Sequence, residues 1–139
     1  IVPDSFKTDL LGGVFDFDSG GSTFNLALYT SQAGFSTATT AYTTSNEVLS
    51  AGTNYTAGGN TLTNNGVAIS SNIAYVDFAD LTFSSVTLSA TGALIYKDTS
   101  NEAVLVLDFG GTKTATNGDF VVQFPAADST NAIIRLGDA

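Results

Sequence analysis

The residues of this chain best able to do chemistry are its carboxylates. Asp16 and Asp18 lie two positions apart in the run Asp-Phe-Asp-Ser-Gly-Gly, which superficially resembles the start of a calcium-binding loop. The further oxygen ligands and the closing glutamate of an EF-hand do not follow. We therefore interpret the run as a turn between strands with solvated acids, and retain Asp16 and Asp18 only as candidate ligands of an incomplete calcium site.

A pair of carboxylates could also hydrolyse a glycoside. Asp77 and Asp80 are three positions apart near an expected strand end, and this spacing does not place them on a common face. A glycosidase needs two carboxyl groups about 5–9.5 Å apart across a cleft, and the chain has no tryptophan to form a sugar platform. We favour a structural role in which Asp77, Asp108 and Asp128 accept backbone hydrogen bonds at strand ends and turns.

The absent residue types exclude most other catalytic chemistry. The chain has no histidine and no cysteine. Histidine is the usual general base at neutral pH and a common metal ligand, and cysteine supplies nucleophilic thiolates, metal thiolates and disulfides. We therefore predict that the protein is not an enzyme and has no catalytic residue, no cofactor and no metal ligand beyond the incomplete pair described above.

The charge balance argues against nucleic acid and membranes as partners. The chain carries 13 acidic and 4 basic residues, a formal net charge of −9, and its basic residues are scattered. Binding to phosphates or to an anionic membrane surface requires clustered lysine and arginine. Only 12% of the residues are charged, roughly half the usual 25%. A surface poor in charge favours packing against other proteins, because a charge buried at an interface must be paired.

The hydrophobic pattern predicts one short helix followed by strands. Residues 4–13 form the best helix candidate, with Asp4 near its start and Gly12 as its stop signal. A helix of about two turns is not stable alone and must dock on something. Residues 23–30 alternate apolar and polar side chains, as a half-buried strand does. Residues 31–65 are rich in Ser, Thr, Asn, Ala and Gly, and we expect a long irregular excursion with short strands or a short helical turn near 46–49.

The second half of the chain is expected to hold the core. Short apolar runs separated by turn signals are typical of an antiparallel sandwich or a Greek-key barrel, and we expect about nine strands in all. Residues 103–109 are apolar on both faces except at Asp108, so we expect a central strand there. The strands expected in this half are Gly66–Ser70, Ile73–Phe78, Leu81–Leu88, Thr91–Tyr96, Ala103–Phe109, Phe120–Phe124 and Ala132–Leu136.

These elements together predict one all-β domain over residues 1–139. Its fold class is an antiparallel β-sandwich or a jelly-roll or Greek-key-like barrel with a short N-terminal helix. The parts that we expect are an N-terminal arm over 1–13, the loop-rich excursion over 31–65 and a core over 66–136.

Several short runs follow one another along nearly the whole chain. They are Ser5–Gly13, Phe24–Ser31, Thr40–Val48, Asn54–Gly59, Ala74–Asp80, Gly92–Tyr96, Val106–Gly110 and Val122–Ala127. In this order they resemble a family of small structural proteins encoded by tailed bacteriophages, including many marine ones. Each run is short, so the resemblance lies in their order and not in any single motif.

The resemblance implies a virion protein, which we interpret as a capsid decoration or cement protein. Its expected partners are the major capsid protein or other virion proteins and further copies of itself in a homo-oligomer, within a phage particle assembled in the bacterial host cytoplasm. A tail, neck or fibre component and a carbohydrate- or surface-binding β-sandwich module are the alternatives. Large apolar side chains in the arm and the excursion are candidate anchors to partners, unless they fold back onto their own core: Phe6, Leu10, Phe35, Tyr42 and Tyr55.

Overall fold

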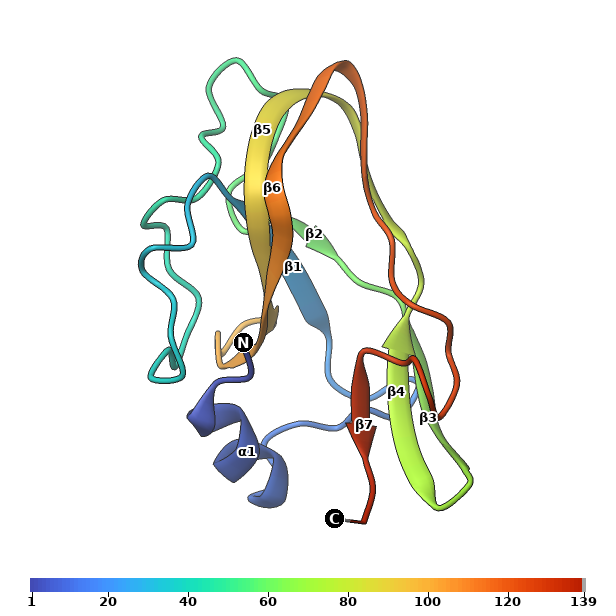
Figure 1. Ribbon diagram of the computed structural model, residues 1–139. Coiled ribbons are helices and arrows are strands. Elements are labelled where there is room, and N and C mark those ends of the chain that lie inside the picture. The colour runs from blue at the N-terminus through green and yellow to red at the C-terminus, as the bar shows by residue number, and fades with distance from the viewer. Residues whose placement is uncertain (139) are drawn as a thin grey trace.

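A computed structural model describes residues 1–138 and shows a mostly β chain with two antiparallel sheets and one short helix (Figure 1). One sheet has four strands in the order β2–β1–β5–β6, and the other has three in the order β3–β4–β7. The elements are α1 (Asp4–Leu11), β1 (Phe24–Tyr29), β2 (Asn60–Thr61), β3 (Asn64–Ser70), β4 (Ile73–Phe78), β5 (Leu81–Lys97), β6 (Ala103–Val122) and β7 (Ile134–Leu136).

Helix α1 ends where the sequence predicts. Gly12 caps it, and the Gly12 amide donates to the carbonyl of Thr8 at 2.9 Å. The buried side chain of α1 is Phe6. Its ring packs on those of Phe15 and Phe17, with centroids 5.4 and 6.2 Å away. This aromatic docking stabilises a helix that is too short to persist in isolation.

Two long strands, β5 and β6, replace four of the expected short ones. They form one hairpin that bends over at the top of the molecule (Figure 1). The expected turns at Gly110-Gly111 and Asn117-Gly118 lie inside β6. Gly110, Gly111 and Asn117 have positive φ, and the β5–β6 register shifts at several points. Such bulges bend a paired strand without ending it, so these signals mark a bend and not the turns that we expected.

The core is not confined to residues 66–136, contrary to the prediction. The main buried cluster includes Phe15, Phe24 and Leu28 from the first part of the chain and Tyr55 from the excursion. β1 lies between β2 and β5 and is buried along almost its whole length. Which strand is central depends on pairing between segments that are distant in sequence, and a local hydrophobic pattern does not predict that pairing.

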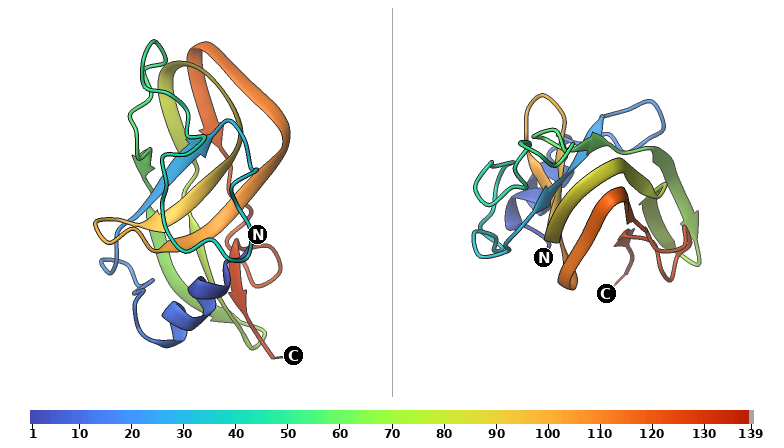
Figure 2. Two further views of the ribbon diagram at one scale, coloured as in Figure 1. Left: turned by 90° about the vertical axis from the view of Figure 1, so that its left-hand side faces the viewer. Right: turned by 90° about the horizontal axis from the view of Figure 1, so that it is seen from above.

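The excursion over residues 31–65 is ordered against the sheet and is not a projecting arm. Its first part lies over the outer face of the four-stranded sheet (Figure 2, left), where Phe35 and Tyr42 pack against a second buried cluster that includes Ala27 and Leu94. Its later part contributes Tyr55 to the main core and strand β2 to the sheet. Residues 1–13 are also attached to it, because the amide of Asp4 donates to the carbonyl of Thr37 at 2.8 Å.

β6 lies at the edge of its sheet and is not the central strand that we expected. Burial on both faces is confirmed for Ala103–Val106 but not for the rest of the expected strand, where Asp108 is exposed. Other segments cover this part of the edge: the amide of Ala103 donates to the carbonyl of Thr40 at 3.0 Å, and the amide of Val106 donates to the carbonyl of Ile1 at 2.9 Å.

Candidate interaction surface

A buried carboxylate fixes the excursion against the sheet. Glu47 is only 6% exposed and forms an isolated antiparallel bridge with Tyr29 at the end of β1. Its Oε1 accepts a hydrogen bond from the hydroxyl of Tyr42 at 2.6 Å. Its Oε2 accepts one from the hydroxyl of Tyr55 at 2.6 Å and one from the amide of Gly58 at 2.7 Å. All three donors belong to the excursion, so Glu47 ties its separate loops together.

Four of the five tyrosines serve this network. Tyr29 of β1 donates to the carbonyl of Thr43, and Tyr96 of β5 donates to the carbonyl of Gly58, both at 2.6 Å. Burial raises the pKa of all four hydroxyls above the ordinary tyrosine value, and the nearby carboxylate of Glu47 raises it further. They therefore stay protonated at neutral pH and remain hydrogen-bond donors. The four residues are Tyr29, Tyr42, Tyr55 and Tyr96.

Sequence reasoning missed Glu47. It expected short strands or a helical turn near residues 46–49, and the structure forms no helix there but a single bridge from Glu47 to Tyr29. A signal was present, because Glu47 is the only charged residue between positions 31 and 65. A lone charge in a long uncharged segment that packs on a sheet must be hydrogen-bonded if it is buried, and the tyrosine hydroxyls on either side of it in sequence supply those bonds.

Two of the five predicted anchors belong to the core of the chain. Phe6 is 5% exposed and Tyr55 is 2% exposed, and both belong to the main buried cluster. Both side chains therefore fold back onto their own core, the alternative to partner contact, although Phe6 also lines the groove described below. The physical reason is that isolated aromatic side chains bury more area by folding back than by staying in solvent.

The other three predicted anchors are half-buried. Phe35 packs edge-on against the ring of Tyr29, with centroids 4.8 Å apart. Tyr42 stacks on Tyr96 at 4.6 Å. Both rings therefore serve mainly to hold the excursion on the sheet. Leu10 lines a groove beside α1 that is described below.

The candidate calcium ligands belong to a closed turn. Oδ1 of Asp16 accepts the amide of Asp18 at 3.0 Å, and the backbone carbonyl of Asp16 accepts the amide of Ser22 at 2.8 Å. Within residues 1–138, no group of three or more His, Cys, Asp or Glu side chains is arranged to hold a metal. These contacts fit the interpretation of the run as a turn with solvated acids.

Asp77 and Asp80 have separate structural tasks. Asp77 is 2% exposed, and its Oδ1 accepts the amide of Phe78 at 2.9 Å, while Oδ2 is buried with no hydrogen-bond partner among the described residues. Burial raises the pKa of Asp77, and the charges of Asp80 and Asp128 raise it further. Asp80 accepts the amide of Phe124 at 2.8 Å. The predicted role as acceptors of backbone hydrogen bonds is confirmed for Asp77, Asp108 and Asp128.

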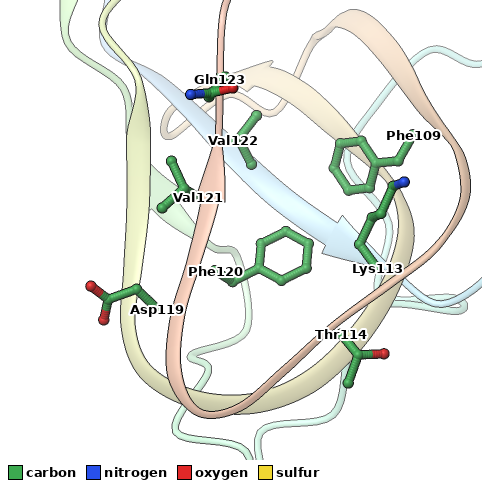
Figure 3. A pocket seen from close by; sticks show the side chains of 8 residues that line it. All are labelled: Phe109, Lys113, Thr114, Asp119, Phe120, Val121, Val122 and Gln123. Carbon is green, nitrogen blue, oxygen red and sulfur yellow. The ribbon is translucent and has the colours of Figure 1, made fainter.

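A hollow of about 650 Å³ lies on the concave side of the bend in β6 (Figure 3). The rings of Phe109 and Phe120 stand 6.0 Å apart there, and the charged lining residues are Lys113 and Asp119. Figure 3 shows Asp119 pointing away from Phe120, and its Oδ1 accepts the amide of Ser85 at 3.3 Å. This carboxylate fastens β5 to β6 at the bend, so the hollow does not present a pair of groups for acid–base chemistry.

A groove of about 750 Å³ runs between α1 and β7, which lie at the lower end of the molecule in Figure 1. Its walls are apolar and poorly covered: Leu11 of α1 is 88% exposed and Leu136 of β7 is 65% exposed. The apolar residues that line it are Val2, Phe6, Leu10, Leu11, Leu105, Ile133, Ile134 and Leu136.

The apolar surface continues across one face of the three-stranded sheet. Residues paired directly in an antiparallel ladder lie on the same face. Val76 on this face is buried in the core, whereas Val67 is 50% and Ile69 is 73% exposed. The core therefore covers Val76 but leaves Val67, Ile69 and Leu136 of this face exposed. The two rows of paired residues are Val67, Val76 and Ile134, and Ile69, Ala74 and Leu136.

The groove is cationic although the protein is acidic. Among the described residues, the charged side chains that line the groove are those of Lys7 and Arg135. No carboxylate belongs to this lining. Lys7 Nζ lies 3.1 Å from Oδ1 of Asp4 in an exposed ion pair, and Arg135 donates to the carbonyl of Thr130 at 2.6 Å. An exposed pair contributes little free energy, so Lys7 can turn to another carboxylate at small cost.

Comparisons with protein-family models, with curated protein sequences and with solved structures find no match to this chain. Within residues 1–138, no helix has the length and apolar character needed to cross a membrane.

Proposed function

We propose that this chain is a non-enzymatic structural protein of a bacteriophage virion, most specifically a capsid decoration or cement protein. The observation that carries the proposal is the uncovered apolar surface made by the α1–β7 groove and the open end of the three-stranded sheet. Contiguous exposed apolar surface marks sites of protein interaction. The resemblance of the sequence to structural proteins of tailed bacteriophages is the reason for proposing a virion as the assembly to which the protein binds.

The architecture suits such a role. We infer that the two sheets are the halves of a β-sandwich related to jelly-roll and Greek-key barrels, open between the edge of β6 and the edge of β7. The excursion adds a third layer, fixed by the Glu47 network. A protein that stabilises a shell through contacts must keep its binding face in a fixed shape, and a closed polar network of this kind supplies rigidity.

The proposed partners are the major capsid protein or other virion proteins and further copies of the chain. The groove is the proposed contact with the capsid protein or another virion protein, and nucleic acid is not a proposed partner because the cations are few. Assembly would take place in the bacterial host cytoplasm, and the mature location would be the phage particle.

The copy number of the chain per particle tests this proposal. Quantitative mass spectrometry of purified particles should give a ratio to the major capsid protein near one or a simple fraction of one. A ratio of a few per cent would instead move the protein to the tail, neck or fibres. Absence from the particles would contradict the virion role.

One observation favours a carbohydrate- or surface-binding module as a second candidate. A hollow of about 480 Å³ within the excursion is lined by Phe35, Tyr42 and several Ser and Thr residues, and aromatic rings beside hydroxyl groups can hold a sugar. A glycan array probed with the wild type and with Phe35→Ala tests it. Glycan binding that the variant loses would support this candidate.

A further inference from the structure

We propose that the α1–β7 groove takes an extended segment of a partner protein, which adds to β7 as a further strand and carries alternating apolar side chains and at least one carboxylate. The inference deepens the proposed function as an interaction protein and rests on it. It names the mode of docking and the chemistry of the segment that docks.

The strand β7 presents a free edge to the groove. Within residues 1–138, β7 pairs with β4 alone, so its other side is unpaired. Residues 133–136 line the groove one after another. Because successive side chains of a strand point to opposite faces, lining by consecutive residues places the backbone edge itself at the groove. Unpaired N–H and C=O groups on such an edge are the template for strand addition.

Apolar surfaces stand on both sides of the position that an added strand would take. Leu10 and Leu11 come from α1, and the open face of the sheet supplies Leu136 and, farther from the groove, Ile69. One set of alternate side chains of the incoming segment would cover these residues. The segment would thus bury apolar surface that the chain leaves exposed by itself.

The charges at the groove select an acidic segment. Lys7 and Arg135 are two of the four basic residues of a chain with a net charge of −9, and the described lining contains no acid. A carboxylate on the incoming segment would pair with Lys7 or Arg135 in the groove lining. A second copy of this chain is the poorer match, because two molecules of the same negative charge repel each other.

The test selects displayed random peptides of about ten residues, a usual strand length, on the wild-type protein, with counter-selection on Leu136→Asp. Enriched peptides should alternate apolar residues and hold more Asp and Glu than Lys and Arg. In fluorescence anisotropy, Leu136→Asp should weaken an enriched peptide about tenfold, and Lys7→Glu or Arg135→Glu about fivefold. The controls Leu49→Asp and Lys113→Glu, outside the groove, should leave binding unchanged, and circular dichroism checks that every variant folds.

Three results would overturn the inference. The first is that no peptide prefers the wild type over Leu136→Asp, and the second is that the enriched peptides are basic. The third is that Lys113→Glu weakens peptide binding as much as Lys7→Glu or Arg135→Glu does. A wild-type dimer in sedimentation that Leu136→Asp abolishes would show that the occupant is a second copy. If the selection yields no peptide but the protein is present in purified particles, only the strand-addition mode of docking is contradicted. If a peptide binds the groove but the protein is absent from particles, only the virion role is contradicted.

Discussion

The excursion over residues 31–65 and the groove between α1 and β7 both lie at the surface, but they differ in how their side chains are paired. The polar groups of the excursion bond to one another, whereas several apolar side chains of the groove have no covering partner within residues 1–138. In the excursion, the carboxylate of Glu47 and the hydroxyls around it bond to one another. At the groove, Leu11 and Leu136 remain mostly in solvent. A long polar loop can thus be complete by itself, while regular elements with apolar side chains can leave a surface that needs a partner.

The largest expected effect comes from breaking the closed region at its centre. Glu47→Ala removes the acceptor of two tyrosine hydroxyls and one backbone amide, and leaves all three donors buried. Each lost hydrogen bond to a buried carboxylate is costly, so we expect the free energy of unfolding to fall by about 3 kcal/mol or more. Urea denaturation followed by circular dichroism measures the change.

The matched variant for this prediction is Glu47→Gln. It keeps one acceptor oxygen and nearly the same volume, so its loss should be about half as large. If Glu47→Ala proved no more harmful than an exposed surface substitution, the excursion would not depend on this network and the contrast with the groove would fail.

A second test of the closed region is Gly59→Ala. Gly59 has φ +79°, and a Cβ placed on it would overlap the backbone of Leu26 in β1. We expect a loss of about 2 kcal/mol from the combined strain and displacement. Gly20→Ala is the control, because φ there is +83° but the space around it is open, and the loss should be only about 1 kcal/mol. Equal thermal midpoints for the two variants would contradict the close packing of the excursion on β1.

The buried carboxyl of Asp77 predicts a pH effect of intermediate size. Its pKa is raised in the folded protein, so above the ordinary aspartate range the folded state binds more protons than the unfolded chain. Stability from this group is therefore lost as pH rises through the raised pKa. Asp77→Asn should increase the free energy of unfolding by about 1 kcal/mol at neutral pH, and the gain should vanish near about pH 3.

The control for Asp77 has the opposite sign. Hydrogen bonds from Asn131 and from the amide of Thr130 lower the pKa of Asp128, so its contribution is present at neutral pH and lost in acid. Asp128→Asn should destabilise the protein at neutral pH and have no effect in acid. Denaturant melts of both variants across this pH range give the comparison, and the same sign for both would refute the assignment.

The smallest effect on folding is expected at the open region. Ile69→Ser and Leu136→Asp alter side chains that are already 73% and 65% exposed, so stability should change by no more than about 0.5 kcal/mol. Binding of an apolar fluorescent dye should be weaker for both variants than for the wild type, because they shrink the exposed apolar patch. A large loss of stability would show that this surface is part of the core.

The sequence could predict the local elements well. The helix over 4–11 and the strand Ile73–Phe78 follow from their stop signals and periodicity. The sequence could not predict that β5 and β6 each continue as one long strand. A Gly-Gly pair such as Gly110-Gly111 is the same sequence signal whether it bends a strand or ends it. The same limit applies to the site: Leu10 was predicted as a contact residue, but the exposure of Leu136 depends on how far the core extends over the sheet, which only the tertiary structure determines.

The most direct measurement of the central claim is an add-back experiment with particles assembled without this chain. Wild-type protein and Leu136→Asp would be titrated onto the particles and the bound copies counted after sedimentation. We predict that the wild type saturates at a simple fraction of the major capsid protein, while Leu136→Asp stays in the supernatant. Equal binding of both proteins, or sedimentation of neither, would contradict the claim that the α1–β7 groove attaches this protein to a virion.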